Sequence, residues 1–177
     1  GRFSTSIVVL AGVALMGIWG RSCKPSFRPQ WNLDLPPLWN ALFWLPWAAF
    51  GAVYVIVAMS PEISSDGTGY HLGLVYRYYE RHGFYRIDSV MYAGLFQGIE
   101  MLYLAAFAIG KHSAAALVHV VFLLLAPFGL LAIARRAGEP RAGVLAAMLF
   151  YLSPVVGKAA ASAYIDTATA VVVIGAF

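Results

Sequence analysis

Residues 113–134 form a run of 22 residues without Asp, Glu, Lys or Arg. At about 1.5 Å per residue, a helix of that length reaches about 33 Å, enough to cross the ~30 Å hydrocarbon core of a bilayer. Only 11% of the 177 residues are charged and 61% are hydrophobic, whereas soluble domains carry about 25% charged residues. We therefore expect a membrane protein built from helices.

Three other stretches are free of charge, and a fourth carries only Lys158 at its end, where a lysine can snorkel to the membrane surface. Together with 113–134, the expected membrane spans are 3–20, 37–60, 142–158 and 167–177 onward. A signal peptide is the alternative for 3–20, although no small-x-small cleavage pattern follows it. The last run is too short to cross a bilayer, so we expect a piece of a longer protein. The predicted fold class is all-α: a polytopic transmembrane helix bundle, truncated at its C-terminus, with one domain over 1–177.

Cysteine content and charge exclude several function classes. The single cysteine, Cys23, cannot form an internal disulfide, and no Cys/His spacing matches a zinc site. A net charge of +4 could suit nucleic acid, yet the basic residues are scattered between apolar runs and form no stripe. We expect no nucleic-acid partner and interpret the basic excess as loop charge that faces the cytoplasm.

The two densest basic loops, 21–28 and 135–141, predict the topology. Both should face the cytoplasm, because positive loops stay on that side. The segment 89–110 is apolar enough to cross, but Glu100 at its centre would cost at least ~2.5 kcal/mol at the bilayer midplane. We therefore expect 89–110 to lie at the outer surface without crossing.

The outer loop, 61–112, contains the longest polar stretch of the chain. Within it, 68–82 mixes aromatic and charged residues, which predicts an amphipathic juxtamembrane helix. Asp66, Glu100 and Asp166 all fall on the predicted outer face. A carboxylate just beyond a membrane helix can act as a general base toward a hydroxyl group, and nearby cations can hold a phosphate at headgroup depth.

Residues 60–72, with the sequence S-P-E-I-S-S-D-G-T-G-Y-H-L, resemble the first outer loop of GT-C class integral-membrane glycosyltransferases. In bacterial members, an Asp just after a helix is followed four and five residues later by Tyr-His. The segments 98–102, 134–138 and 163–167 are similar, in that order, to the family's next outer segment, cytoplasmic turn and second outer loop. The resemblance covers roughly two thirds of the chain. It implies the N-terminal portion of a bacterial dolichyl-phosphate-mannose-mannosyltransferase-like enzyme of the cell envelope, in the inner (cytoplasmic) membrane.

The resemblance also implies the reaction and the residues that perform it. A sugar would move, with inversion, from a polyprenyl-phosphate donor to an acceptor at the outer membrane face, and Asp66 would be the general base. The side chains expected to bind substrate are Tyr70, His71, Arg77, Arg81, Glu100, Lys158 and Asp166. Asp66 and Asp166 are also candidate ligands of a divalent cation, Mg²⁺ or Mn²⁺. The fragment alone should be inactive, since the family places part of the donor site in a C-terminal half.

Two other function classes stay open. A non-catalytic transmembrane subunit of a larger membrane complex could carry haem or chlorin on His119 or His112. A transporter could place Glu100 on an ion path. Membrane lipids are expected partners in every case. The enzyme interpretation makes one geometric demand: the carboxyl groups of Asp66 and Asp166 should open onto one outer cavity, with Glu100 near it.

Overall fold

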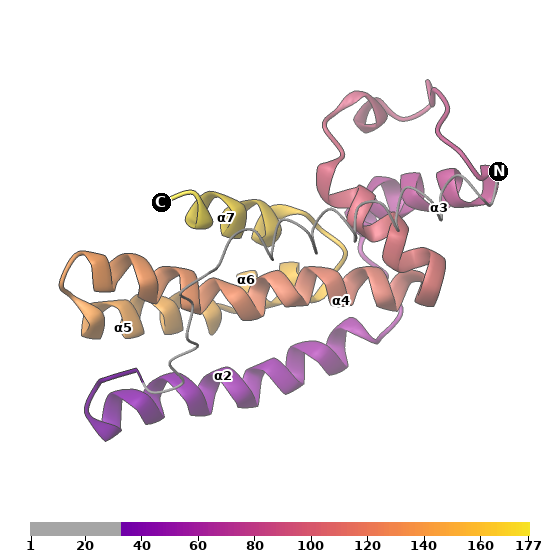
Figure 1. The fold of residues 1–177 in the computed structure, drawn as a ribbon. Helices are drawn as coiled ribbons and strands as arrows, with labels where there is room; N and C mark the ends of the chain where they lie inside the picture. The colour runs from indigo at the N-terminus through magenta and orange to yellow at the C-terminus, as the bar shows by residue number, and fades with distance from the viewer. Residues whose placement is uncertain (1–32) are drawn as a thin grey trace.

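The computed structural model describes residues 33–177 (Figure 1). The expected span 3–20 and the basic loop 21–28 lie outside the described residues. Over 33–177 every regular element is helical, as predicted, and this part of the chain forms no strand. The helices are α2 (Pro37–Ala58), α3 (Leu72–Arg81), α4 (Gly98–Arg136), α5 (Pro140–Tyr151), α6 (Pro154–Ala161) and α7 (Asp166–Gly175), with a π-helical turn η1 (Gly67–His71) and a 3-10 turn η2 (Met91–Gly94).

Two helices, α2 and α4, are long and apolar enough to cross a membrane, and α5 with α6 would make a third crossing if the bent pair acts as one span. Helices of this length and composition indicate a membrane protein. The span expected over 142–158 is divided by a bend of 60° between α5 and α6. Pro154 accounts for the bend, because proline cannot donate a helical hydrogen bond and disfavours helical geometry at Ser153, which is extended (ψ 122°).

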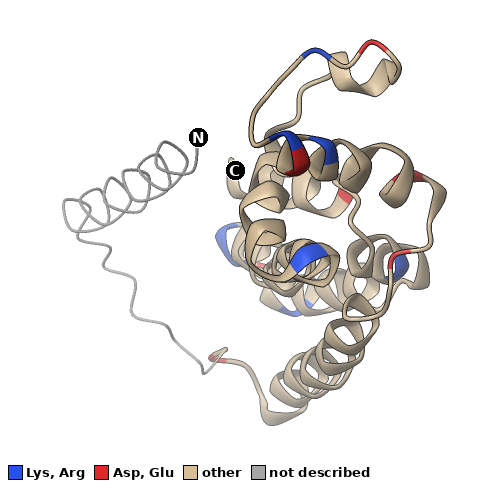
Figure 2. Ribbon diagram, turned by 90° about the vertical axis from the view of Figure 1, so that its right-hand side faces the viewer, with Lys and Arg blue, Asp and Glu red and all other residues tan. Residues whose placement is uncertain are grey.

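The main helices lie alongside one another, and α3 with its neighbouring loops gathers at one end of them (Figure 1). We call this end, made of residues 60–109 and 162–166, the α3 end. The Arg135 guanidinium donates a hydrogen bond to the Leu33 carbonyl, so the basic turn 135–141 lies beside the start of α2. Figure 2 shows charged residues on α3 and the loops, while the α2 ribbon carries none.

The main core lies between α2, α4 and α5. Phe43, Leu123 and Tyr151 are fully buried there, and each buried large side chain contributes about 1.5–3 kcal/mol. Two tyrosines also join α2 to the end of α5. The Tyr54 hydroxyl donates to the Tyr151 carbonyl at 2.7 Å, while the Tyr151 hydroxyl donates to the Trp47 carbonyl at 2.9 Å. The polar tips of these rings are therefore satisfied inside an apolar core.

α4 breaks at Gly110 and Lys111, where the chain changes direction (Figure 1). Lys111 has a φ of 58°, outside helical geometry. Its ammonium lies 3.9 Å from the centroid of the Tyr79 ring, a cation–π contact that ties the break to α3. Residues before the break pack on α3, with Tyr103 and Phe107 in a small separate core. The predicted separation of 89–110 from 113–134 is therefore found, although the helix begins only at Gly98.

The amphipathic helix predicted over 68–82 is present as η1 followed by α3. Its buried face consists of Leu72, Leu74, Val75 and Tyr78. Glu80 and Arg81 lie on the exposed face. The helix ends at His82, whose left-handed conformation (φ 51°) stops the helical hydrogen bonding. One face of α3 is thus fixed to the first half of α4, which sets the position of η1 and of the residues just before it.

Candidate active site

His71 and Glu100 form a buried pair at the α3 end. Their exposed fractions are 4% and 5%, and His71 Nδ1 lies 2.8 Å from Glu100 Oε1. His71 is the last residue of η1 and Glu100 lies in the first turn of α4, so the pair joins two elements that are 29 residues apart in sequence. The predicted contact of Glu100 with substrate stays a prediction, but its partner in the structure is His71.

The second carboxylate oxygen of Glu100, Oε2, is buried and has no hydrogen-bond partner within the described residues. A buried carboxylate that is only half satisfied is costly, and its one bond to His71 is therefore important for stability. The same bond restricts the imidazole ring, because Nδ1 is committed to Glu100 and only Nε2 is left for other contacts. Glu100 thus acts on the orientation of His71.

Tyr70 brings Asp66 and Asp166 into one site. Its ring stacks on Tyr92, with centroids 4.1 Å apart, and lies 4.2 Å from the His71 ring. Partial burial raises the pKa of the Tyr70 hydroxyl, and the nearby carboxylates of Asp66 and Asp166 raise it further. Both carboxylates are therefore within electrostatic reach of one hydroxyl, although 100 residues separate them in the sequence.

Asp66 and Asp166 occupy equivalent local positions. Asp66 immediately precedes η1, and Asp166 is the first residue of α7. Both side chains are exposed, and neither caps its own helix with a hydrogen bond. Their carboxylates are therefore available to a molecule at this surface.

Glu62 links the two loops that carry these acids, and the sequence analysis missed it. One of its carboxylate oxygens accepts the Ser64 N–H and the other accepts the Ala163 N–H, each at 2.9 Å. Partial burial would raise the pKa of Glu62, but hydrogen bonds from Ser64 and Ala163 lower it below its ordinary value. Nothing local in the sequence relates Glu62 to a residue 101 positions later. The only hint of a role for Glu62 in the local sequence was its place beside a proline in a short loop.

His119 fixes the α6–α7 loop from within α4. Its Nδ1 lies 2.8 Å from the Ser162 carbonyl, and its Nε2 accepts the Ala168 N–H at 3.3 Å. Both ring nitrogens are therefore hydrogen-bonded to backbone groups near helix ends, where the backbone would otherwise lack a partner. This arrangement leaves no nitrogen lone pair of His119 for haem or chlorin.

Tyr103 holds the same loop through its hydroxyl, which donates to the Tyr164 carbonyl. Tyr164 in turn lies beside the site residue His71, with ring centroids 6.1 Å apart. Glu62, Tyr103 and His119 therefore all bind the backbone just before Asp166, and they fix its position relative to Asp66.

Arg77 and Arg81 contact a different segment. Arg77 donates to the Ser89 hydroxyl at 3.1 Å, and the Arg81 guanidinium lies 4.7 Å from the centroid of the Tyr85 ring. Both arginines thus hold the segment after α3 against the helix. Lys158, exposed on α6, lies in the wall of a groove with Glu62. Substrate binding by these three cations stays a prediction.

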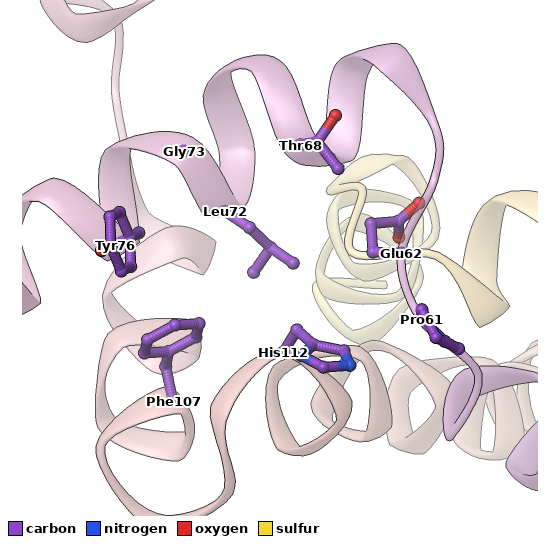
Figure 3. A pocket seen from close by; sticks show the side chains of 8 residues that line it. All are labelled: Pro61, Glu62, Thr68, Leu72, Gly73, Tyr76, Phe107 and His112. Carbon is purple, nitrogen blue, oxygen red and sulfur yellow. The ribbon is translucent and has the colours of Figure 1, made fainter.

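Two neighbouring hollows border the α3 end and share Pro61, Glu62 and His112 in their walls. The first has a volume of about 300 Å³. Figure 3 shows its lining, which consists of Pro61, Glu62, Thr68, Leu72, Gly73, Tyr76, Phe107 and His112. The second, of about 350 Å³, lies between α2 and α6. Asp66 and Asp166 line neither hollow, so their predicted common cavity is not one of these two.

The divalent cation stays a prediction. Over residues 33–177, no group of three or more His, Cys, Asp or Glu side chains is arranged to hold a metal ion. Asp66 and Asp166 are exposed carboxylates, and Mg²⁺ is often bound by one or two carboxylates together with water and substrate phosphate. These two residues would supply the protein ligands.

Comparison of the chain with protein-family models, curated proteins and solved structures gives no match. The GT-C resemblance of residues 60–72 therefore stays a prediction. Function is inferred below from the geometry of the α3 end.

Proposed function

We propose that this chain is the N-terminal part of a membrane glycosyltransferase of the GT-C type, which transfers a sugar from a polyprenyl-phosphate donor to an acceptor. One observation carries the proposal. Two exposed carboxylates, Asp66 and Asp166, act on the same tyrosine hydroxyl beside the buried His71–Glu100 pair. Acids from distant segments therefore lie at the same end of apolar helices, where a lipid-linked substrate would present its sugar and phosphate.

In this mechanism Asp66 accepts the proton of the acceptor hydroxyl. The acceptor oxygen attacks the anomeric carbon, and the bond from that carbon to the phosphate oxygen breaks. Polyprenyl phosphate leaves with the electron pair on the opposite side, so the anomeric configuration inverts. Asp66 suits this role because it is exposed at the start of η1 and makes no capping bond. Asp166 would bind acceptor hydroxyls or a divalent cation.

A contact of His71 with the substrate would be confined to Nε2, because only 4% of the residue is exposed. Its Nδ1 is held by Glu100 at 2.8 Å, and an imidazole fixed at one nitrogen can offer the other in a defined direction. Tyr70 and Tyr164 flank the His71 ring and would form the walls around a sugar. Glu100 acts through His71 as a positioning residue.

The charge pattern predicts which end of the protein faces the outside of the membrane. The basic turn 135–141 lies beside the start of α2, while Asp66, Glu100 and Asp166 lie at the α3 end. Basic loops stay in the cytoplasm, so the α3 end would face the outside of a bacterial inner membrane. A polyprenyl tail would then stay in the bilayer beside α2.

The test uses the full-length protein in membranes, supplied with a panel of radiolabelled undecaprenyl-phosphate hexoses and pentoses. Asp66→Asn should abolish sugar transfer because it removes the proton acceptor while keeping the size of the side chain. Asp88→Asn is the matched control, since Asp88 is also exposed and lies at the same end, where it pairs with Arg86. An Asp66→Asn protein that transfers sugar at the native rate would refute the role of Asp66.

A further inference from the structure

We propose that the groove between α2 and α6 binds one phospholipid whose headgroup carries both a phosphate and a primary ammonium, as in phosphatidylethanolamine. The groove has a volume of about 350 Å³. It is the second of the two hollows that border the α3 end. The proposal does not depend on sugar transfer, because neither Asp66 nor Asp166 lines this groove.

The walls of the groove suit an acyl chain. Val53 and Val57 of α2 form one side, and they are 50% and 48% exposed. Three small residues, Ala116, Gly157 and Ala161, also line the groove. The valines belong to the uncharged surface of α2, which is expected to face lipid. The groove therefore opens where an acyl chain can enter sideways from the bilayer.

The wall of the groove carries one cation, Lys158. α2 stops at Ala58, so the lining residues that follow it lie at the end of a candidate membrane span. Lys158 and His112 line this end and are both exposed. The ion pairs of His71 with Glu100 and of Arg86 with Asp88, both within residues 33–177, do not include Lys158. Lys158 thus has no acidic partner there, and a phosphate would supply one.

Glu62 adds a negative group to the groove. With Pro61 and His112 it lines both the groove and the first hollow, which Figure 3 shows. Its two oxygens each accept one amide N–H, but a carboxylate has about four acceptor positions. An ammonium group can therefore still donate to it. A headgroup with only negative charge would meet Lys158 favourably and Glu62 unfavourably. A headgroup with both charges matches both residues.

The experiment measures which lipids the full chain retains. The purified protein is equilibrated in mixed micelles that contain equal amounts of phosphatidylethanolamine, phosphatidylcholine and phosphatidylglycerol, and native mass spectrometry counts the bound lipids. Phosphatidylcholine keeps the phosphate but has no N–H donor. We expect it to be retained about tenfold less than phosphatidylethanolamine, a factor that corresponds to ~1.4 kcal/mol, about the value of one charge-assisted hydrogen bond.

Variants of the protein test the phosphate contact. Lys158→Gln should lower the retention of phosphatidylethanolamine about tenfold. Arg141→Gln, which removes an exposed cation from the opposite end of the bundle, should leave retention unchanged. The proposal is overturned by equal retention of the three lipids, by a preference for phosphatidylglycerol, or by a Lys158→Gln protein that retains phosphatidylethanolamine as Arg141→Gln does.

Discussion

Replacing His71 by alanine is expected to destabilise the protein more than replacing Glu100 by glutamine. His71→Ala removes the only hydrogen bond of a carboxylate that is 5% exposed and whose other oxygen already lacks a partner within 33–177. Leaving such a charge unpaired costs about 3–5 kcal/mol, a large part of a typical unfolding free energy of about 5–15 kcal/mol. Glu100→Gln removes the charge but keeps an acceptor oxygen for His71, so it should cost about 1–2 kcal/mol.

A double variant separates the contribution of the His71–Glu100 bond from the cost of burying either side chain without its partner. When His71 and Glu100 are both alanine, neither partner is left alone in the core. The double variant should therefore be more stable than the sum of the two alanine variants predicts, by about 1–3 kcal/mol. Unfolding free energies would be measured by SDS titration of the protein in detergent micelles, followed by circular dichroism. His112→Ala is the control, because His112 is exposed and should change stability by no more than about 0.5 kcal/mol.

Two results would refute this reasoning. Additive effects of the two alanine substitutions would mean that His71 and Glu100 do not stabilise each other. A Glu100→Gln protein less stable than His71→Ala would mean that the negative charge itself, and not its hydrogen bond, is what the fold requires.

Two further predictions concern packing and pH. Gly157→Ala should cost about 1–3 kcal/mol, because its new Cβ would lie 2.5 Å from the Tyr54 ring, while Gly175→Ala, with no atom within 4 Å, should be neutral by the same SDS titration. Glu62→Gln should cost about 1–2 kcal/mol at neutral pH, since an amide offers one acceptor oxygen to two N–H groups. The pKa of Glu62 is lowered from its ordinary 4.5, so this stabilisation is complete above about pH 4.5 and is lost progressively as the pH falls from there through the lowered pKa. Unfolding at several pH values should show the difference in stability between the native protein and the Glu62→Gln variant shrinking below about pH 4.5, and a constant difference would contradict the prediction.

Charge spacing was enough to predict the long helices. The uncharged run at 37–60 predicted α2, which spans Pro37–Ala58. Glu100 and the uncharged run that follows it predicted that 89–110 is separate from 113–134, and the chain breaks at Gly110–Lys111. These features depend on what each segment can tolerate in an apolar environment, which the local sequence determines.

The pairing inside the site could not be predicted in the same way. The sequence indicated that Glu100 needs a partner, but not that His71 would provide it, because that choice depends on how η1 and α3 pack on α4. The contact between Glu62 and Ala163 is set by tertiary structure for the same reason. The bend before Pro154 is different: its signal was present in the sequence, since a proline restricts the residue before it.

The backbone that carries Asp166 also determines when the α3 end is completed during synthesis. Glu62 leaves the ribosome 101 residues before Ala163, its hydrogen-bond partner. At about 5–20 residues per second, roughly 5–20 s pass in which Glu62 lacks its bond to Ala163. Tyr103 and His119 also form their hydrogen bonds only after this short segment has been synthesised. A chain cut before Ser162 would therefore keep α2 and α3 but leave the Tyr103 hydroxyl and the His119 imidazole without their backbone partners, and the Glu62 carboxylate with the Ser64 N–H alone.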